Sequence, residues 1–315
     1  MARRTTLILL VLLALACGRR PQANFDGPIV TPTWLAEAQA QRGKQLVIAE
    51  ASWAPASEAR DYLAGHIPGA IHINTDVFEN GPPRWHLRPD AELHAALGEL
   101  GITGDSTVVV YGKQTIAAAR VWWVLEYAGV KDVRYLDGGL RAWKRGGFTV
   151  ETAPTVLPRA RFEARLREEV LATTSYVREH RREAILADVR SAEEYRGEVS
   201  GYSYLDAKGR ISGARPVGNG DDSAILYQNS DGSLREADKV RSLWRDAGIL
   251  GGPEIVFYCG SGWRSSLAFL HARAMGLRNV RNYSDGWSGW STVYEQTPGL
   301  GWRQSPSANP IERGR

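Results

Sequence analysis

Short apolar runs alternate with amphipathic stretches in the second half of the chain, and this pattern predicts alternating strands and helices. Three runs have the length of buried strands, at residues 185–188, 255–258 and 280–283. Apolar residues at helical spacing predict helices at 234–247 and 265–275. Strands that alternate with helices are typical of a parallel sheet covered by helices on both faces. We therefore expect an α/β fold.

The first half of the chain repeats this pattern. When the sequence is displaced by 147 residues, the run 108–111 falls on 255–258, Gly139 falls on Gly286, and other glycine, valine and tryptophan positions also coincide. A repeat of this length indicates two complete domains and not a solenoid. The chain is therefore interpreted as a tandem duplication.

The domain boundaries follow from changes in composition. A glycine-rich stretch at 197–220 interrupts the second half, and we expect it to be a surface loop near a cleft. A proline- and arginine-rich stretch separates the two halves. The predicted organisation is a signal segment at 1–16, a first domain at 25–147, a linker at 148–171, a second domain at 172–295 and a tail at 296–315.

The composition mainly argues against particular functions. The chain has 315 residues, of which 43% are hydrophobic and 23% charged, as in ordinary globular proteins. Its formal net charge of +4 falls to +2 without Arg3 and Arg4, and such a small excess does not favour nucleic-acid binding. The six histidines include no pair at ligand spacing beside a cysteine or paired carboxylates, so no metal site is predicted.

The first 17 residues have the organisation of an export signal. Arg3 and Arg4 precede an apolar core, and the small residue Ala16 stands before Cys17. Residues 13–17 resemble a bacterial lipoprotein cleavage box, in which the cysteine becomes the lipidated first residue. The alternative is an ordinary cleaved signal with an incidental cysteine. We expect an exported, periplasmic protein that meets a membrane only through a lipid anchor on Cys17.

The candidate chemistry lies directly after the strand predicted at 255–258. This strand delivers Cys259 into a short loop, and the loop N–H groups, the following helix N-terminus and Arg264 together favour a thiolate or a bound anion. Gly260 and Gly262 allow the backbone to turn tightly around the sulfur. The alternative is an inert core cysteine. Since a lone thiol in an exported protein is a liability unless it is used, we interpret Cys259 as a nucleophile.

The first half lacks these groups. Displacement by 147 residues places Gly112 opposite Cys259 and Ala117 opposite Arg264. We therefore expect the N-terminal half to be catalytically silent, either structural or one wall of a cleft. Its best candidate contributor is His66, for which the alternative is a structural hydrogen-bonding role.

Several motifs in both halves carry a family resemblance. The sequence resembles the two-domain rhodanese family of sulfurtransferases, which use thiosulfate or 3-mercaptopyruvate. The resemblance implies two tandem rhodanese-like domains, each a mainly parallel sheet with helices on both faces, with the second domain active and the site at the domain interface. The motifs are residues 60–70 (RDYLAGHIPGA), Leu136-Asp137-Gly138-Gly139, Asp188-Val189-Arg190, Tyr195-Arg196-Gly197 and the Cys259 loop.

The same resemblance implies a sulfur-transfer reaction without a cofactor. Cys259 would take sulfane sulfur from a small donor, hold it as a persulfide and pass it to cyanide or a thiol. Arg190 and Arg196 would bind the donor, because an arginine fork can hold an oxyanion with two hydrogen bonds. The alternative for each arginine is a salt bridge. Asp188 would hold the active loop in shape.

The loop leaves the sulfur donor open. Ser261 stands where the mercaptopyruvate type has a serine that assists the chemistry, whereas Arg264 is absent from that type. An extra cation suits a dianion, so thiosulfate is favoured. Gly260, Gly262 and Trp263 would contact the substrate, and Trp263 would shield the sulfur from water.

Two other classes of protein fit parts of the pattern. A cysteine-dependent phosphatase needs five residues between cysteine and arginine to surround a phosphate, but only four separate Cys259 from Arg264. A non-catalytic persulfide carrier would use the same cysteine without fast turnover. Persulfide formation and steady-state kinetics would separate these alternatives.

Overall fold

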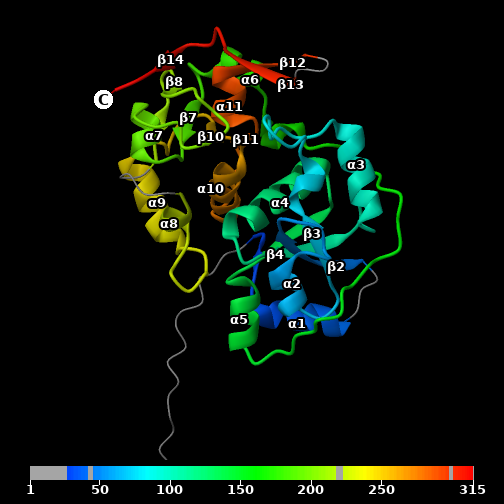
Figure 1. Ribbon diagram of the computed structural model, residues 1–315. Coiled ribbons are helices and arrows are strands. Elements are labelled where there is room, and N and C mark those ends of the chain that lie inside the picture. The colour runs from blue at the N-terminus through cyan, green and yellow to red at the C-terminus, as the bar shows by residue number, and fades with distance from the viewer. Residues whose placement is uncertain (1–26, 42–44, 218–222, 298–300, 315) are drawn as a thin grey trace, which may run out of the picture.

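The chain forms two α/β halves, each built around its own five-stranded parallel sheet (Figure 1). The computed structural model describes residues 27–41, 45–217, 223–297 and 301–314. The predicted α/β class and the presence of two parallel sheets are confirmed. Cys17 and the predicted signal segment lie outside the described residues.

The N-terminal sheet has the strand order β1-β5-β4-β2-β3, with β4 in the centre. Side chains of β4 alternate between two cores, because successive residues of a strand point to opposite faces. Val108 and Val110 face one core, and Val109 and Tyr111 face the other. The strands are β1 (Ile29–Val30), β2 (Leu46–Ser52), β3 (Ala70–Asn74), β4 (Thr107–Tyr111) and β5 (Asp132–Leu136).

Helices cover both faces of this sheet. Leu35 and Trp143 pack on the Val109 face, and Leu93, Leu97 and the long apolar helix α4 pack on the other. The helices are α1 (Pro32–Gln41), α2 (Arg60–Ala64), the 3-10 helix η1 (Thr75–Phe78), α3 (Asp90–Glu99), α4 (Thr115–Ala128) and α5 (Gly139–Arg145).

The C-terminal sheet repeats this order as β6-β11-β10-β7-β9, so β10 occupies the central place that β4 has in the first sheet. The strands predicted at 185–188, 255–258 and 280–283 are confirmed as β7, β10 and β11. The sheet strands are β6 (Leu171–Ala172), β7 (Ile185–Asp188), β9 (Arg215–Pro216), β10 (Ile255–Tyr258) and β11 (Val280–Tyr283).

The helices of the C-terminal half also lie on both faces of its sheet. Val177, Trp287 and Trp290 pack on one face, and Val240 and Trp244 pack on the other. The helices are the 3-10 helix η2 (Glu168–Val170), α6 (Thr174–His180), α7 (Ala192–Arg196), α8 (Ser223–Tyr227), α9 (Ala237–Asp246), α10 (Trp263–Ala274) and α11 (Gly286–Ser291).

Two helix boundaries differ from the prediction. The helix predicted at 265–275 begins two residues earlier, because Gly262 takes the left-handed conformation (φ +84°) and starts α10 at Trp263. The helix predicted at 234–247 is shorter, since residues 228–234 form a turn that closes with a Gln228–Leu234 bridge. The sequence pattern therefore located both helices, and the turn chemistry set their ends.

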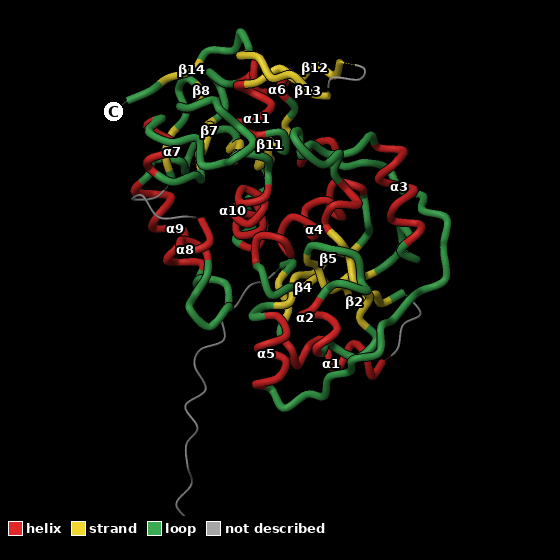
Figure 2. The backbone as a smooth tube through the Cα atoms, in the orientation of Figure 1, coloured by secondary structure: helices red, strands yellow, loops and turns green. Residues whose placement is uncertain are grey.

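Helices α4 and α10 join the two halves. They lie side by side near the middle of the molecule (Figure 2), and the Trp122 and Phe269 ring centroids are 6.2 Å apart. One continuous apolar core runs from the inner face of each sheet through these two helices. The domain contact is therefore part of the hydrophobic core, and side chains of either half can reach the other.

The segments outside the two sheets are also ordered. The predicted linker runs along the N-terminal half, where Glu151 pairs with His66 and Thr155 with Ile71. Strand β12 (Thr292–Thr297) begins within the predicted second domain and pairs antiparallel with β13 (Gly301–Pro306), which lies in the predicted tail. Also in the predicted tail, β14 (Ile311–Glu312) pairs with β8 (Arg210–Ile211) of the C-terminal half.

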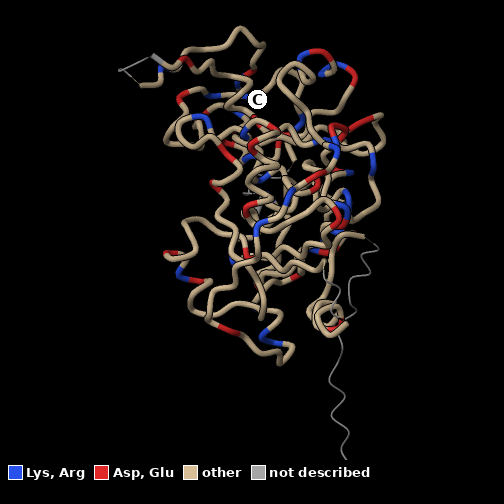
Figure 3. The backbone as a smooth tube through the Cα atoms, turned by 90° about the vertical axis from the view of Figure 1, so that its right-hand side faces the viewer, with Lys and Arg blue, Asp and Glu red and all other residues tan. Residues whose placement is uncertain are grey.

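Charged residues of both signs are mixed along the backbone. Lys and Arg residues are interspersed with Asp and Glu along both halves (Figure 3). Among the described residues, no helix has the length and apolar character needed to cross a membrane.

Candidate active site

Cys259 lies at the carboxyl end of β10, in the loop that leads into α10. Hydrogen bonds fix this loop from below: the N–H groups of Trp287 and Ser288, at the start of α11, donate to the carbonyls of Cys259 (2.7 Å) and Gly260 (2.9 Å). These bonds occupy the carbonyls of Cys259 and Gly260 and fix the loop on the start of α11.

Both loop glycines are required by close approaches. A Cβ atom at Gly260 would lie 1.9 Å from the Tyr202 ring. A Cβ atom at Gly262 would lie 2.5 Å from the Ser284 carbonyl oxygen, and the left-handed φ there also disfavours other residues. The structure therefore shows a tight turn at Gly262 and a close side-chain approach at Gly260.

The sulfur is buried but faces a cavity. Cys259 is only 1% exposed, and the Ser265 hydroxyl lies 3.6 Å from Sγ. That hydroxyl also bonds the Asn282 side chain, whose amide donates to the Gly262 carbonyl (3.1 Å). A cavity of about 240 Å3 opens over the sulfur, and it is lined by Trp53, Trp85, Ile116, Tyr202, Tyr204, Cys259, Ser261, Trp263 and Arg264.

Arg264 is fixed at the far end of the loop. Its two terminal nitrogens donate to the two carboxylate oxygens of Glu194 at 2.8 and 2.7 Å, and it also contacts the Tyr202 hydroxyl. Burial raises the pKa of Glu194, but the hydrogen bonds and charge of Arg264 outweigh it, so the net pKa lies below its ordinary value. The Gly260 N–H also donates to Tyr202 (2.9 Å). The cation is therefore held rigidly beside the loop.

The N-terminal half contributes to the loop from across the domain contact. The Trp263 ring stacks on Trp53, with centroids 5.1 Å apart and planes 5° apart. The Trp263 indole N–H donates to Glu79 (2.7 Å), which also accepts from Arg120 (2.9 Å). Arg120 in turn donates to the Ser284 hydroxyl (3.0 Å). The predicted wall of the cleft therefore includes a buried ion pair, Arg120 with Glu79, that is hydrogen-bonded to Trp263 of the loop.

Arg190 does not reach the cavity. Its side chain is fully buried and forms a forked contact with Asp188, with nitrogen–oxygen distances of 2.6 to 3.2 Å. It also donates to the Gly209 carbonyl (2.8 Å). In this placement the guanidinium is turned toward Asp188 and lies outside the cavity lining, so its role in donor binding stays a prediction. Asp188 accepts from Tyr258 (2.6 Å), one residue before Cys259, and so supports the loop indirectly.

Two further predicted residues lie away from the sulfur. Arg196 is partly exposed and pairs with Glu198 (2.6 Å), which is the salt bridge expected as its alternative. His66 is fully buried in the N-terminal half, where its ring bonds the carbonyls of Tyr62 (2.8 Å) and Ala153 (3.2 Å). His66 therefore has the structural role that was its alternative, and Ser261 is left without a histidine partner from that position.

Sequence reasoning missed the groups that complete the cavity. Tyr202 and Tyr204 lie in the glycine-rich insertion expected near the cleft, and the two aromatic residues so close together were an available signal. Glu194 stands two residues before Arg196 and gave no separate signal. Nothing in the sequence pairs Glu79 with Trp263, because that contact depends on how the halves pack. Among the described residues, no cluster of three or more potential metal ligands occurs.

Comparisons with known proteins agree with this geometry. The family model of the rhodanese-like domain matches residues 31–146 and 173–292. Thiosulfate sulfurtransferase YnjE of Escherichia coli is 39% identical over 84% of this chain, which spans 63% of YnjE. Sulfur carrier protein TtuD of Thermus thermophilus is 32% identical over 74% of the chain and 84% of TtuD. 3-Mercaptopyruvate sulfurtransferase of E. coli is 30% identical over 82% of the chain and 92% of that protein.

Solved structures give the same picture. The crystal structure of YnjE matches with a TM-score of 0.77 and 36% identity, covering 91% of this chain and 68% of YnjE. An anaerobic ergothioneine biosynthesis enzyme from Chlorobium limicola, in complex with its natural substrate trimethyl histidine, matches with a TM-score of 0.79 and 32% identity, covering 93% and 72%. The chain belongs to the rhodanese family and contains two rhodanese-like domains.

Proposed function

We propose that this protein is a sulfurtransferase that moves sulfane sulfur from thiosulfate through a Cys259 persulfide to a thiol or cyanide. One observation carries the proposal. Cys259 lies in a glycine-turned loop whose carbonyls are bonded away by α11, and its sulfur faces a cavity between the two halves. The sulfurtransferase relatives support the same reaction class.

The reaction is a pair of sulfur transfers. The Cys259 thiolate attacks the outer sulfur of thiosulfate, a new sulfur–sulfur bond forms, and sulfite leaves with the electrons of the broken bond. An acceptor thiolate or cyanide then attacks the outer sulfur of the persulfide, and the Cys259 thiolate leaves. Loop amides and Arg264 stabilise the sulfur anion present at the start and end of each step.

Thiosulfate remains the favoured donor, but for a different reason than the one expected from the sequence. We expected the extra cation at Arg264 to favour a dianion, but Glu194 balances that charge at 2.7 to 2.8 Å. Arg190 and Arg196 lie outside the cavity, so no second arginine compensates. Thiosulfate is supported by the name of YnjE, of which this chain spans 63%. Apart from Arg264, the cavity residue best suited to donate a hydrogen bond to an oxyanion is Ser261.

Mass spectrometry tests the first transfer directly. Incubation with thiosulfate should add about 32 mass units to the intact protein, and cyanide should remove them. The Cys259→Ser protein should gain no mass. Turnover of thiosulfate with cyanide or a thiol should be sustained; a single loading without turnover would instead favour a carrier like TtuD. No mass gain from thiosulfate or 3-mercaptopyruvate would contradict the proposal.

A second acceptor class is favoured by the aromatic lining of the cavity. Five aromatic residues surround the space over the sulfur, and aromatic faces bind planar rings and quaternary ammonium groups. The Chlorobium enzyme is described in complex with trimethyl histidine, which combines both groups. We infer transfer of sulfur to such a ring as the second candidate function.

This second candidate has its own assay. Persulfide-loaded protein is mixed with trimethyl histidine, and the small molecules are examined by mass spectrometry for a sulfur-containing product. Plain histidine is the control, because it keeps the ring and lacks the quaternary ammonium. Absence of product with persulfide intact would leave the thiosulfate reaction standing and exclude this acceptor.

We further propose export and lipid attachment at Cys17. The support is the sequence alone: two arginines, an apolar core and a small residue before the cysteine. Expression of the full chain with labelled fatty acid should give a labelled membrane-bound protein, and Cys17→Ser should remove the label. An unlabelled wild-type protein would contradict the proposal.

A further inference from the structure

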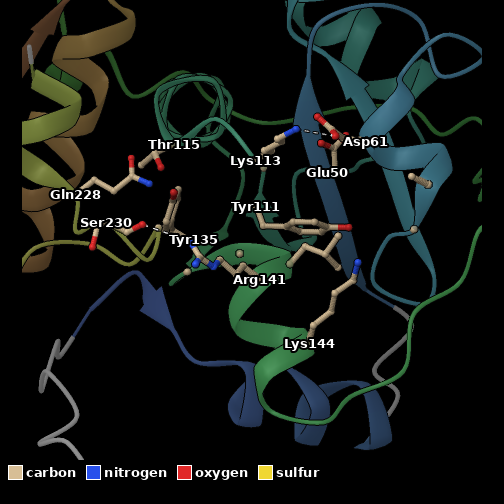
Figure 4. A pocket seen from close by; sticks show the side chains of 17 residues that line it. Glu50, Asp61, Tyr111, Lys113, Thr115, Tyr135, Arg141, Lys144, Gln228 and Ser230 are labelled. Atoms are coloured by element: carbon tan, nitrogen blue, oxygen red, sulfur yellow. Dashed lines mark hydrogen bonds and ion pairs between the residues drawn. The ribbon is translucent and has the colours of Figure 1, made fainter.

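The N-terminal half carries a second cavity at the same place in its fold as the active cavity of the C-terminal half. It lies at the carboxyl ends of β2, β4 and β5, where Gly112 occupies the position of Cys259 (Figure 4). Ligands of open α/β sheets bind at these strand ends. The volume is about 590 Å3, compared with about 240 Å3 over Cys259. It is large enough for a small organic molecule.

The charges around this cavity are unequal. Three cations line it, Lys113, Arg141 and Lys144, against two carboxylates, Glu50 and Asp61, which gives a net charge of +1. Both carboxylates are already paired, Glu50 with a histidine at 2.7 Å and Asp61 with Lys113 at 2.9 Å. Arg141 and Lys144 are therefore the charges left to attract a ligand.

Neither remaining cation forms a salt bridge among the described residues. Hydrogen bonds from Ser233, and then the charges of Arg145 and Arg141, hold the pKa of Asp231 below its ordinary value, so Arg141 does interact with this carboxylate. Arg141 donates to the carbonyl oxygen of Ser230 at 3.3 Å, a long bond to a neutral group. The Lys144 ammonium lies about 4.0 Å from the position that a Cβ atom on Gly65 would take, at the edge of the cavity. Figure 4 shows Lys144 rising from α5 toward Tyr111. Both cations come from α5 and line the same cavity, with Arg141 turned toward Ser230 and Lys144 toward Tyr111 on the other side (Figure 4).

Backbone and aromatic groups complete the lining. Helix α4 begins at Thr115 without a side-chain cap, so its positive end faces the cavity. Tyr111, Tyr135 and Leu140 supply apolar surface. The arrangement suits a molecule with a carboxylate at one end and a flat apolar portion at the other.

The C-terminal half closes one side of the cavity. Gln228, Ser230 and Gly232, from the turn between α8 and α9, belong to its lining. The same turn is tied to the N-terminal half by the Leu234 N–H, which donates to Asp137 at 2.7 Å. A ligand here would contact both halves and so stabilise their association.

We propose that this cavity is a second binding site, separate from the persulfide, for a small organic carboxylate held by Lys144 and Arg141. The proposed site is formed by the strand ends and helix N-terminus of the domain copy that has Gly112 in place of a cysteine. It does not depend on sulfur transfer.

Binding is tested on the full chain carrying Cys259→Ser, so that failure of the proposed sulfur transfer cannot affect the result. The probe is benzoate, and benzamide is the uncharged control of the same shape. Calorimetry should show saturable 1:1 binding of benzoate with a raised melting temperature, and no binding of benzamide. Lys144→Ala and Arg141→Ala should each weaken benzoate binding about tenfold, as expected for loss of one charge-assisted contact.

Lys131→Ala is the matched control, since Lys131 is an exposed lysine outside this cavity that pairs with Asp105. It should bind benzoate as the parent does. Lys144 and Arg141 are exposed, so their variants should fold, and circular dichroism checks this. The proposal is overturned if benzoate does not saturate, if benzamide binds equally well, or if both variants bind like the Lys131→Ala protein.

Discussion

The two halves keep the same scaffold at their central strand ends and differ in the residue that comes next. Tyr111 ends β4 and accepts a hydrogen bond from the Ile67 N–H at 3.1 Å, while Tyr258 ends β10 and accepts from the Ile211 N–H at 3.4 Å. After these tyrosines the chain continues with Gly112 in one half and with Cys259 in the other. Both halves therefore keep the supporting tyrosine, whereas the cysteine that we propose as nucleophile has a glycine in its place in the N-terminal half.

The difference shows how a duplicated domain can divide one task. The C-terminal half provides the thiol, the loop and the fixed cation. The N-terminal half, relieved of that chemistry, provides Trp53 for stacking and the Glu79–Arg120 pair that holds Trp263. Its own strand ends remain as an open cavity. In the proposed reaction the N-terminal half would act as a structural partner, and variants of both halves can test this division.

Exchange of the residues at the two strand ends should have the largest effect. Cys259→Ser should reduce thiosulfate:cyanide transfer at least about a thousandfold, because the attacking atom is lost. Gly112→Cys in that background should not restore activity. Its new side chain would lie 2.4 Å from the Ala51 carbonyl oxygen, and the shorter loop has no arginine like Arg264. Recovered thiocyanate production would mean that the halves are more alike than the structure indicates.

Arg190→Ala should affect stability and not donor binding. The substitution leaves Asp188 buried without its partner, which costs about 3 to 5 kcal/mol in the free energy of unfolding. Arg196→Ala should change stability little, because its salt bridge with Glu198 is open to solvent. Urea unfolding measures both. A raised KM for thiosulfate in folded Arg190→Ala, without loss of stability, would restore its predicted role in donor binding.

His271 should make the C-terminal half sensitive to acid. Burial lowers the pKa of His271 from 6.5 to about 4. The unfolded chain takes up a proton below pH 6.5 and the folded chain does so only near pH 4, so stability falls by about 3 kcal/mol across that interval. Val124 holds the equivalent place in α4. His271→Val should flatten the pH dependence of urea unfolding; an unchanged slope would contradict this cause.

Glu79→Ala should have the smallest effect on turnover, about a tenfold loss in kcat/KM of the folded protein, equivalent to about 1.4 kcal/mol. It should also lower stability, because the buried Arg120 loses its carboxylate partner. Trp263 then loses its hydrogen bond and Arg120 its partner. Glu79→Gln keeps an acceptor for Trp263 and should recover part of the activity. Glu50→Gln is the control, since Glu50 is a buried carboxylate of the same half that does not contact the loop. Equal losses in Glu79→Ala and Glu50→Gln would indicate general destabilisation and not positioning.

The strands, the duplication and the nucleophile were all predictable from the sequence because they depend on local patterns. Apolar runs fixed β7, β10 and β11, and the glycine-flanked Cys259 identified the loop. The arginines were harder. A guanidinium two residues after Asp188 can turn back onto that carboxylate or reach outward to a ligand, and only the packing of Tyr258 and Trp287 around it decides.

The contacts across the domain boundary were not predictable for a different reason. Trp53, Glu79 and Arg120 meet the loop only after α4 has packed on α10, and no spacing in the sequence records that meeting. Burial also changes their chemistry, since it raises the pKa of Glu79 against the opposing effects of Arg120 and Trp263. The sequence therefore located the chemistry, and tertiary packing supplied its surroundings.

The indole of Trp263 is held by both halves, because its ring stacks on a tryptophan of the other domain and its N–H donates a hydrogen bond to a glutamate of that domain. A truncated gene that encoded only the second half would thus produce a thiol loop with one side unsupported. If Cys259 carries the proposed sulfur chemistry, selection on that chemistry also acts on residues hundreds of bases upstream of the cysteine codon, which would give the N-terminal copy a reason to persist.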